Sequence, residues 1–428
     1  MTPVPFELPI RPAEAAALAD LIFGHAGART LNEDLRSRLA GRAASLKLET
    51  VTPWFGTLDR DPVHPSAFYL AVDGQHGEPL LLYIAPASAP SSGYFPRSLL
   101  IARMRSSGNR EIVVNAVPFG PAERDNVCKY TEQVNREFLP RPQGSRPAIV
   151  VSSTAPEAVL PEAFAAWREI WKRTGQNLAG LQLDPASWQV GLWAAIRAGW
   201  REGYHAAPGR LAAAVSLDNA RAAIRKAAAC SKFGIDPVRF PAVGCFEDFT
   251  SPEEREDLLE QFARSFTAGD ESYDLSREAV MAMAARLGPG LACAVNLHDA
   301  IRQARVAGRY GRAFDFELLL DAAPAQTSPQ ELIFCLGWLK ARGRAAQLVA
   351  PRLPASGTPE ELAAAMKPLA AVARQFGATL SMALAGGETA ATLEAVGRAT
   401  LGRVVVTLPG RPGTTGAEIL RVAGHLFG

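Results

Sequence analysis

The stretch FDFELLLD at residues 314–321 is followed by the helical pattern PQELIFCLGWLKAR at 329–342 and then by AQLVAP at 346–351. Near-continuous apolar runs such as the first and the last are typical of strands buried on both faces of a parallel sheet. Parallel neighbours need a long crossover between them, usually a helix. This stretch therefore predicts a strand–helix–strand unit of an α/β protein.

The same alternation extends outward over the chain from residue 148. Further apolar, strand-like runs lie at 148–153, 181–184, 212–217, 292–297, 379–384 and 403–409, and helical patterns lie between them. About eight strands alternating with helices over roughly 280 residues fit a (β/α)₈ barrel, and a doubly wound open sheet is the alternative. No Gly-x-Gly-x-x-Gly motif follows a strand, so a Rossmann dinucleotide site is a weak interpretation.

The first 140 residues have a different pattern. An Ala-rich helical region at about 12–47 precedes short strand-like runs at 46–51, 67–72, 79–85 and 111–117, which Gly and Pro separate. Short strands with turn residues between them predict an N-terminal α+β domain at 1–140. The segment FLPRPQGSRP at 138–147 holds three prolines and suits neither a helix nor a central strand. We therefore predict a linker there and a TIM-like (β/α)₈-barrel domain at 148–428.

Composition excludes several classes of protein. The 428 residues include 45 Lys+Arg and 43 Asp+Glu, so the net charge of +2 gives no electrostatic footprint for nucleic acid. Five dispersed cysteines without a Cys-x-x-Cys pair argue against a disulfide framework and a zinc ribbon. The first residues do not resemble a signal peptide, and no apolar run approaches the ~20 residues of a membrane span. We expect a cytoplasmic protein without a membrane partner.

Polar residues at predicted strand ends are the candidate catalytic groups. Asp315, Glu317 and Asp321 share one face of their strand because side chains alternate along it. A carboxylate inside a barrel is costly unless it is paired, binds a metal or takes part in catalysis. We select Glu317 and Asp321 as catalytic candidates, with a barrel-interior salt bridge to an arginine as the alternative. His298 is a third candidate, as a general base beside Asp299, although such pairs more often cap a helix.

Two glycine-rich loops near the carboxyl terminus are candidate anion sites. The residues AGGET at 385–389 and PGRPGTTG at 409–416 each open a helix, where free backbone N–H groups can bind an anion. Loops after the seventh and eighth strands often bind phosphate in this fold. We therefore assign substrate binding to Gly386, Gly387 and Arg411, with Arg352 as a further partner for a carboxylate. The alternative is two ordinary capped turns, which the acidic Glu388 favours.

Several motifs together resemble the tagaturonate/fructuronate epimerase family of hexuronate catabolism. They are FLPRPQGSRPAI (138–149), WAAIRAGWREGY (193–204), FDFELLLD with TSPQEL (314–321, 327–332), LVAPRL (348–353) and GGETAATLEAVGRATLGR (386–403). That family is metal-dependent and inverts one hydroxyl-bearing carbon of a keto-uronate. The resemblance implies a sugar-acid ligand and adds Arg141 and Gln143, together with Arg352, to the substrate-binding candidates.

The sequence departs from that family where its chemistry resides. Leu384 and Val405 stand where the family pattern has histidines, and Gly209, Arg210 and Ala322 replace further polar positions. No His-Glu-x-x-His or His-x-His spacing is present, so we predict no metal site although the family uses a divalent cation. We expect a diverged member with lost or altered activity, which binds a small sugar acid or acts in a homo-oligomer or beside an active paralogue. The alternatives are an active metal-dependent isomerase with a rearranged site, and a non-catalytic scaffold.

Overall fold

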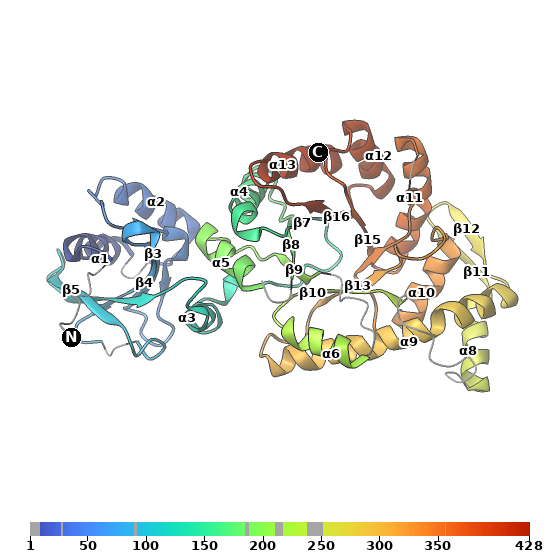
Figure 1. The fold of residues 1–428 in the computed structure, drawn as a ribbon, viewed down its shortest axis with the longest axis horizontal. Helices are drawn as coiled ribbons and strands as arrows, with labels where there is room; N and C mark the ends of the chain where they lie inside the picture. Colours follow the sequence, from blue (N-terminus) through green and yellow to red (C-terminus); the bar gives the residue numbers. More distant parts are fainter. Residues whose placement is uncertain are drawn as a thin grey trace, which may run out of the picture. The chain divides into compact units, whose positions relative to one another are not determined.

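The computed structural model describes residues 9–26, 29–89, 92–184, 188–209, 217–237, 251–355 and 357–428. Its contacts divide the chain into two compact units, shown in Figure 1. The first unit comprises residues 1–139 and 192–202, and the second comprises 140–191 and 203–428.

The first unit is an antiparallel sheet covered by two helices. Helices α1 (Pro12–Ala26) and α2 (Glu33–Ala43) precede six strands in the order β1-β3-β4-β6-β5, with β2 paired to β3. The strands are β1 (Thr52–Pro53), β2 (Asp59–Arg60), β3 (Phe68–Asp73), β4 (Pro79–Pro86), β5 (Leu99–Arg105) and β6 (Glu111–Pro118). Alternate residues of β3 and β4 join Leu18 of α1 and Leu39 of α2 in one apolar core, because alternate side chains of a strand share a face.

The strands expected at 67–72, 79–85 and 111–117 correspond to β3, β4 and β6. The strand expected at 46–51 is wrong, since those residues are irregular, and β5 was not foreseen. After β6 come α3 (Arg124–Lys129), a π-helical turn (Tyr130–Val134) and a 3₁₀ turn (Arg136–Phe138).

Residues 192–202 belong to the first unit although their sequence position lies within the predicted barrel domain. Trp193 packs edge-on against Trp54 and Phe119, with ring centroids 5.3 Å apart in both pairs. Gly199 meets Gly56 so closely that a Cβ on either residue would lie 2.8 Å from the other's Cα. Arg201 is held by Asp59 at 2.7 Å. Aromatic burial and this ion pair together explain why the segment belongs with the first unit.

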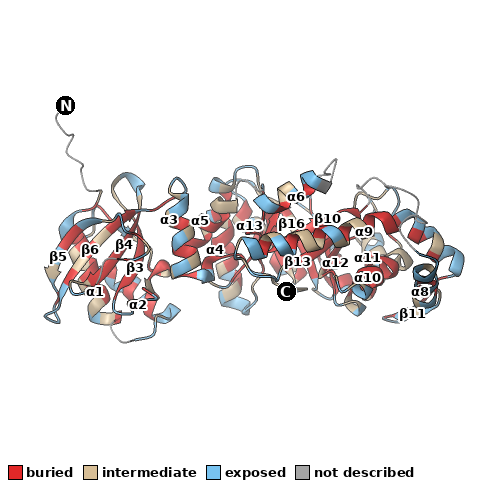
Figure 2. Cartoon of the chain, turned by 90° about the horizontal axis from the view of Figure 1, so that it is seen from below, coloured by how far each residue is buried: buried red, intermediate tan, exposed pale blue. Residues whose placement is uncertain are grey.

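The second unit is a parallel barrel, which confirms the predicted fold class. Eight strands lie in the order β10-β13-β14-β15-β16-β7-β8-β9 within the described residues. They are β7 (Ala148–Ser152), β8 (Ala179–Leu183), β9 (His205–Pro208), β10 (Lys232–Ile235), β13 (Asp315–Leu319), β14 (Leu348–Ala350), β15 (Thr379–Ala383) and β16 (Val404–Pro409). Ser231, just before β10, donates its backbone N–H to Ala206 O of β9 at 2.9 Å, so these two end strands also meet. Figure 2 shows that the strands are largely buried.

Helices surround the barrel strands. They are α4 (Pro156–Thr174), α6 (Leu217–Lys226), α8 (Pro252–Phe262), α9 (Arg277–Ala307), α10 (Pro329–Ala341), α11 (Pro359–Gln375), α12 (Ala390–Thr400) and α13 (Thr415–Leu426), and a hairpin of β11 (Ser265–Ala268) and β12 (Glu271–Asp274) follows α8. Helix α5 (Trp188–Ala198) is divided between the units, since its residues from 192 onward belong to the first. Capping boxes fix the starts of α10 and α11, where Ser328 pairs with Glu331 and Thr358 with Glu361. Pro at the first helical position reinforces both starts.

Two of the expected strands do not appear among the described strands. The run at 292–297 is wrong as a strand, because it lies inside the 31-residue helix α9. Helix α9 continues through the Gly-Pro-Gly sequence at 288–290. A Cβ at Gly290 would lie 2.0 Å from Pro237 O, so glycine permits a close backbone approach there. The run at 212–217 lies outside the described residues except for Leu217, which begins α6.

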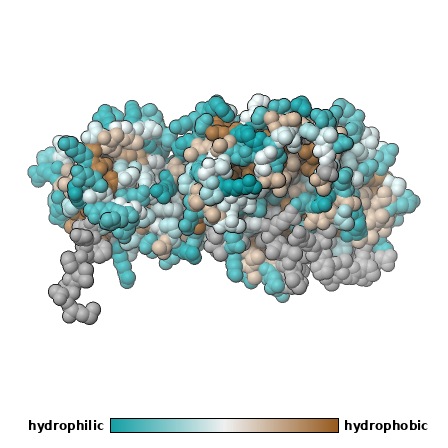
Figure 3. Space-filling model, turned by 45° about the horizontal axis from the view of Figure 1, so that its top comes forward, coloured by the Kyte–Doolittle hydropathy of each residue, from teal (hydrophilic) through white to brown (hydrophobic). Residues whose placement is uncertain are grey.

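Helix α9 is long and apolar enough to span a membrane by length and composition. However, 56% of its most apolar window is buried inside the protein, as in a core helix. On the face of the molecule in Figure 3, apolar side chains occur in scattered groups among hydrophilic ones.

Candidate binding site at the carboxyl end of the barrel

A cavity of about 420 Å³ lies at the carboxyl ends of the barrel strands. Its walls come from inward-facing positions of successive strands and from the loops that follow them. They include Gln182, Ala207, Gly234, Glu317, Leu319, Ala350, Ser381, Ala383 and Thr407 on strands, and Asp321, Arg352, Leu353 and Pro354 on loops. Catalytic and binding residues of TIM barrels lie at this end. We call this space the barrel-mouth cavity.

A buried ion pair lies at the base of the barrel-mouth cavity. Lys232 Nζ of β10 lies 3.0 Å from Glu317 Oε2 of β13, and the two side chains are only 3% and 10% exposed. Gly234 faces the same carboxylate, and a Cβ there would lie 3.2 Å from Glu317 Oε2. Sequence reasoning selected Glu317 but missed Lys232. The four-residue strand KFGI is too short and too mixed in polarity to be recognised, and its isolated lysine was the available signal.

Asp321 and Arg352 lie at the rim of the same cavity. Arg352 Nη1 donates a hydrogen bond to the backbone oxygen of Asp321 at 2.9 Å, and the Arg352 backbone N–H donates to Thr327 Oγ1 at 2.8 Å. These contacts join the loops after β13 and β14. The structure therefore brings together Glu317, Asp321 and Arg352 from the predicted set.

Hydroxyl and amide groups complete the polar lining. The Oγ of Ser381 is buried and has no hydrogen-bond partner within the described residues. Gln182 and Thr407 also face the cavity. An unsatisfied buried hydroxyl is costly, so a polar ligand or water atom is the natural partner for Ser381.

A second buried pair lies at the opposite end of the barrel. His205 Nδ1 and Asp315 Oδ2 are 3.2 Å apart, and both residues begin their strands. Burial lowers the pKa of His205, and the neighbouring Asp315 opposes that shift. Asp315 also accepts hydrogen bonds from the backbone N–H groups of Gln143 at 2.7 Å and Gly144 at 2.9 Å.

The structure places Arg141 and Gln143 beside this second pair and not in the lining of the barrel-mouth cavity. The Arg141 backbone N–H donates to Tyr204 O at 3.1 Å, and Gln143 closes the barrel over Asp315. The linker enters β7 from its amino end, so both residues lie at the end of the barrel opposite to the cavity. Neither residue lines the barrel-mouth cavity, and their role in substrate binding stays a prediction.

His298 is also placed away from the cavity. It lies within α9, and its ring contacts Phe314 and Phe316 at centroid distances of 4.7 and 5.6 Å. Phe316 and Glu317 alternate along β13, so they face opposite sides of the strand. Burial, with Arg344 nearby, lowers the pKa of His298. The run at 292–297 that was expected to present His298 from a strand is part of α9, so His298 and Glu317 lie on opposite sides of β13. Its role as a general base beside Asp299 stays a prediction.

The two glycine-rich loops are already occupied by the protein's own carboxylates. Glu388 Oε1 accepts from the N–H groups of Ala385 at 2.5 Å and Gly386 at 3.1 Å, and Glu418 Oε1 accepts from Gly387 at 3.3 Å.

Backbone N–H groups of the loop after β16 are likewise bound by a carboxylate of the chain itself. Glu162 accepts from Gly413 at 2.6 Å and Gly416 at 3.4 Å. The Arg411 backbone N–H donates to Thr415 Oγ1 at 2.8 Å. Side chains of the chain itself thus bind backbone donors of both loops, which favours the alternative of two ordinary capped turns over the anion site predicted at Gly386, Gly387 and Arg411.

The described residues do not fit the divalent cation that the family resemblance implies. They contain no group of three or more His, Cys, Asp or Glu side chains close enough to hold a metal ion. Leu384 and Val405 are buried aliphatic residues at the positions of the family's histidines. The ammonium of Lys232 already lies against Glu317. Arg210, a further replaced position, and Cys245 lie outside the described residues.

Comparison with solved structures agrees with this architecture. No protein-family model matches the sequence, and a search of curated proteins gave no match. The native structure of fructuronate-tagaturonate epimerase UxaE from Cohnella laeviribosi matches with a TM-score of 0.60 and 16% identity, covering 87% of this chain and 74% of that one. Its complex with one glycerol matches with a TM-score of 0.59, covering 88% and 74%. The resemblance expected from the motifs is thus confirmed for the fold, which is all that 16% identity shows.

Proposed function

We propose that this chain binds a small sugar acid in the barrel-mouth cavity, as a diverged relative of the sugar-acid epimerases, without a metal ion in the site. One observation carries the proposal: a cavity of about 420 Å³ is lined by both Arg352 and Glu317, and the Glu317 carboxylate is paired with the buried Lys232. That volume lies within the ~300–1,000 Å³ usual for small-molecule sites.

The lining suits a polyhydroxy carboxylate. The guanidinium of Arg352 can bind a carboxylate at the rim in a bidentate, charge-assisted manner. Below it, Ser381, Gln182 and Thr407 offer donors and acceptors for hydroxyl groups. At the base, Glu317 can accept a hydrogen bond from a ligand hydroxyl, and Lys232 holds that carboxylate in place.

The same geometry disfavours the two alternatives. An active isomerase built on Glu317, Asp321 and His298 is disfavoured because β13 separates the histidine from the two carboxylates. A scaffold whose barrel interior is filled is disfavoured by the open cavity and by the unpartnered hydroxyl of Ser381.

Calorimetric titration of the full chain tests the proposal. We expect fructuronate or tagaturonate to bind, and fructose and tagatose, which lack the carboxylate, to bind much more weakly. Arg352→Ala removes a charge-assisted contact of about 1.5–3 kcal/mol, so we expect roughly 10–100-fold weaker binding of the acid. Arg398→Ala, at an exposed arginine of α12 outside the cavity lining, is the matched control and is expected to bind like the wild type.

Turnover is measured in the same preparation. We expect no interconversion of the two keto-uronates by NMR, with chelator or with added Mn²⁺, Zn²⁺ or Ni²⁺. Epimer formation that depends on added metal would contradict the metal-free site. Equal binding of acids and neutral sugars, or full affinity in Arg352→Ala, would contradict the assignment of the carboxylate to Arg352.

A further inference from the structure

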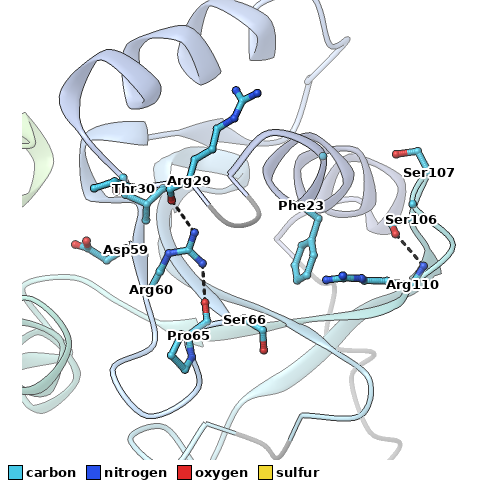
Figure 4. Close-up of a pocket in the computed structure, with 13 residues that line it drawn as sticks. Phe23, Arg29, Thr30, Asp59, Arg60, Pro65, Ser66, Ser106, Ser107 and Arg110 are labelled. Atoms are coloured by element: carbon cyan, nitrogen blue, oxygen red, sulfur yellow. Dashed lines mark hydrogen bonds between the residues drawn. The ribbon is translucent and has the colours of Figure 1, made fainter.

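The first unit contains a second, larger cavity with a cationic lining. It measures about 1180 Å³ and is formed by parts of three segments, 23–31, 59–66 and 106–110 (Figure 4). Three arginines contribute to its lining, namely Arg29, Arg60 and Arg110. Figure 4 shows the Arg29 side chain directed away from Arg60 and Arg110, with its backbone oxygen turned toward Arg60. We call this space the arginine cavity.

The carboxylate on the lining is already neutralised. Asp59 lies 3.3 Å from Arg36 and 2.7 Å from Arg201, and Asn135 also contacts it. Neither Arg29 nor Arg110 forms an ion pair with any residue that the structure describes. The lining therefore carries an excess of positive charge, which raises the local concentration of anions.

Arg60 is held rigidly in the wall. Its Nη1 donates to Pro65 O at 2.6 Å, and its Nη2 donates to Ala26 O at 2.7 Å and Arg29 O at 2.8 Å. The guanidinium also stacks 4.8 Å from the ring of Phe68. Carbonyl oxygens orient a guanidinium without cancelling its charge, so Arg60 gives the cavity a fixed positive wall.

Arg110 lies across the cavity from Arg60, at the end of a turn that side-chain hydrogen bonds hold in place. The turn 106–110 joins β5 to β6, and Ser106 Oγ accepts from the Arg110 backbone N–H at 3.1 Å. Ser107 donates its backbone N–H and its hydroxyl to Asp20 of α1, at 2.8 and 2.9 Å. Figure 4 shows the Arg110 side chain directed toward Phe23, with Ser66 below the ring and Arg60 on the far side.

We infer that the arginine cavity is a binding site for a small organic anion, a phosphate or carboxylate borne on an apolar or ring-containing skeleton. Arg110 binds the anionic group beside Phe23, and the fixed charge of Arg60 adds to the attraction, since guanidinium groups match the oxygens of phosphates and carboxylates. Phe23, whose ring packs edge-on against Phe68 at 5.4 Å, offers a surface for the uncharged part of the ligand. This inference does not rest on the proposed function of the barrel.

Calorimetry on the full chain tests it with four probes: inorganic phosphate, adenosine 5′-monophosphate, benzoate and uncharged adenosine. We expect adenosine monophosphate or benzoate to bind more tightly than inorganic phosphate, adenosine to bind more than tenfold more weakly than its monophosphate, and the affinity to fall with ionic strength. Binding of adenosine monophosphate identifies a phosphate site, and binding of benzoate alone identifies a carboxylate site.

Variants locate the binding. Arg110→Glu is expected to weaken the anion at least tenfold, and Arg29→Ala to weaken it by a smaller factor. Arg103→Ala is the matched control, since Arg103 is an exposed arginine of β5 outside the lining. Arg352→Ala is expected to leave this binding intact, which separates it from the barrel. Binding of none of the anions at millimolar concentration, or full affinity in a folded Arg110→Glu variant, overturns the inference.

Discussion

At the scale of single residues, the buried pair of Lys232 and Glu317 makes a sharp prediction. Lys232→Met leaves the carboxylate of Glu317 buried without its cation, which is expected to cost about 3–5 kcal/mol of the free energy of unfolding. The double variant Lys232→Met/Glu317→Leu removes both charges and is expected to recover most of that loss, since apolar replacement of a buried pair is often nearly neutral. Urea unfolding of both single variants and the double variant measures the coupling. A loss below about 1 kcal/mol in Lys232→Met would show that water, not Lys232, stabilises Glu317.

The same pair shows what could be predicted about single residues. Alternation along FDFELLLD identified Glu317 as an inward carboxylate, because a long apolar strand makes its polar positions visible. Lys232 could not be found in the same way, since its strand is four residues long. His298 was misplaced because a short apolar run can belong to a buried helix as well as to a strand. Which residues share a site depends on how distant strands and helices pack together, and the sequence around each residue does not contain that information.

At the scale of elements, an ion pair within α13, whose Glu418 also accepts a hydrogen bond from Gly387 of the loop after β15, predicts a dependence of stability on pH. Arg421 donates hydrogen bonds to both carboxylate oxygens of Glu418, at 2.6 and 2.8 Å, and lowers the pKa of that carboxyl below its ordinary 4.5. The folded state binds this proton more weakly than the unfolded state does. The stabilisation is therefore present above about pH 4.5 and is lost as the pH falls through the lowered pKa.

We therefore expect Glu418→Gln to be less stable than the wild type at pH 7, by up to about 1 kcal/mol because the pair is partly exposed. The difference should shrink toward zero near pH 3. Chemical unfolding at both pH values measures it, with Glu360→Gln, at a carboxylate in the first turn of α11, as the control for loss of charge alone. An equal difference at both pH values would mean that Glu418 acts through packing and not through its charge.

Elements with strong local signals were predictable, and short ones were not. Capping residues and Pro at the first helical position marked α10 and α11, and apolar runs marked β13 to β16. By contrast, β9 and β10 have four residues each and contain His, Lys, Pro and Gly, which disfavour recognition as strands. The barrel supplies their pairing, so tertiary context decides their structure.

At the scale of the whole molecule, the division into units shows a limit of reading along the chain. Composition predicts a change of domain at the linker 138–147, and the contacts of the chain divide it between residues 139 and 140. Residues 192–202, however, return to the first unit through Trp193, Gly199 and Arg201. Such a return leaves no mark in composition or periodicity, because it depends on which surface the aromatic side chains meet.

The thermal stability of the whole chain is expected to be independent of divalent metal ions. The described residues offer no cluster of ligands, and the resembled family's histidine positions hold Leu384 and Val405. A ligand that binds only the folded state adds about 2.7 kcal/mol at a concentration 100 times its Kd, which is a shift of several degrees in Tm for domains of ~150–250 residues. We expect protein purified without chelator to hold no stoichiometric metal, and its Tm to stay within about 1 °C on adding EDTA or micromolar Mn²⁺, Zn²⁺ or Ni²⁺.

Fructuronate or tagaturonate is expected to raise Tm under the same metal-free conditions, because the proposed site binds the acid through Arg352 and the hydroxyl-bearing lining. If the acid raises Tm only after metal is added, ligand binding and metal binding are coupled, and the metal-free site is refuted.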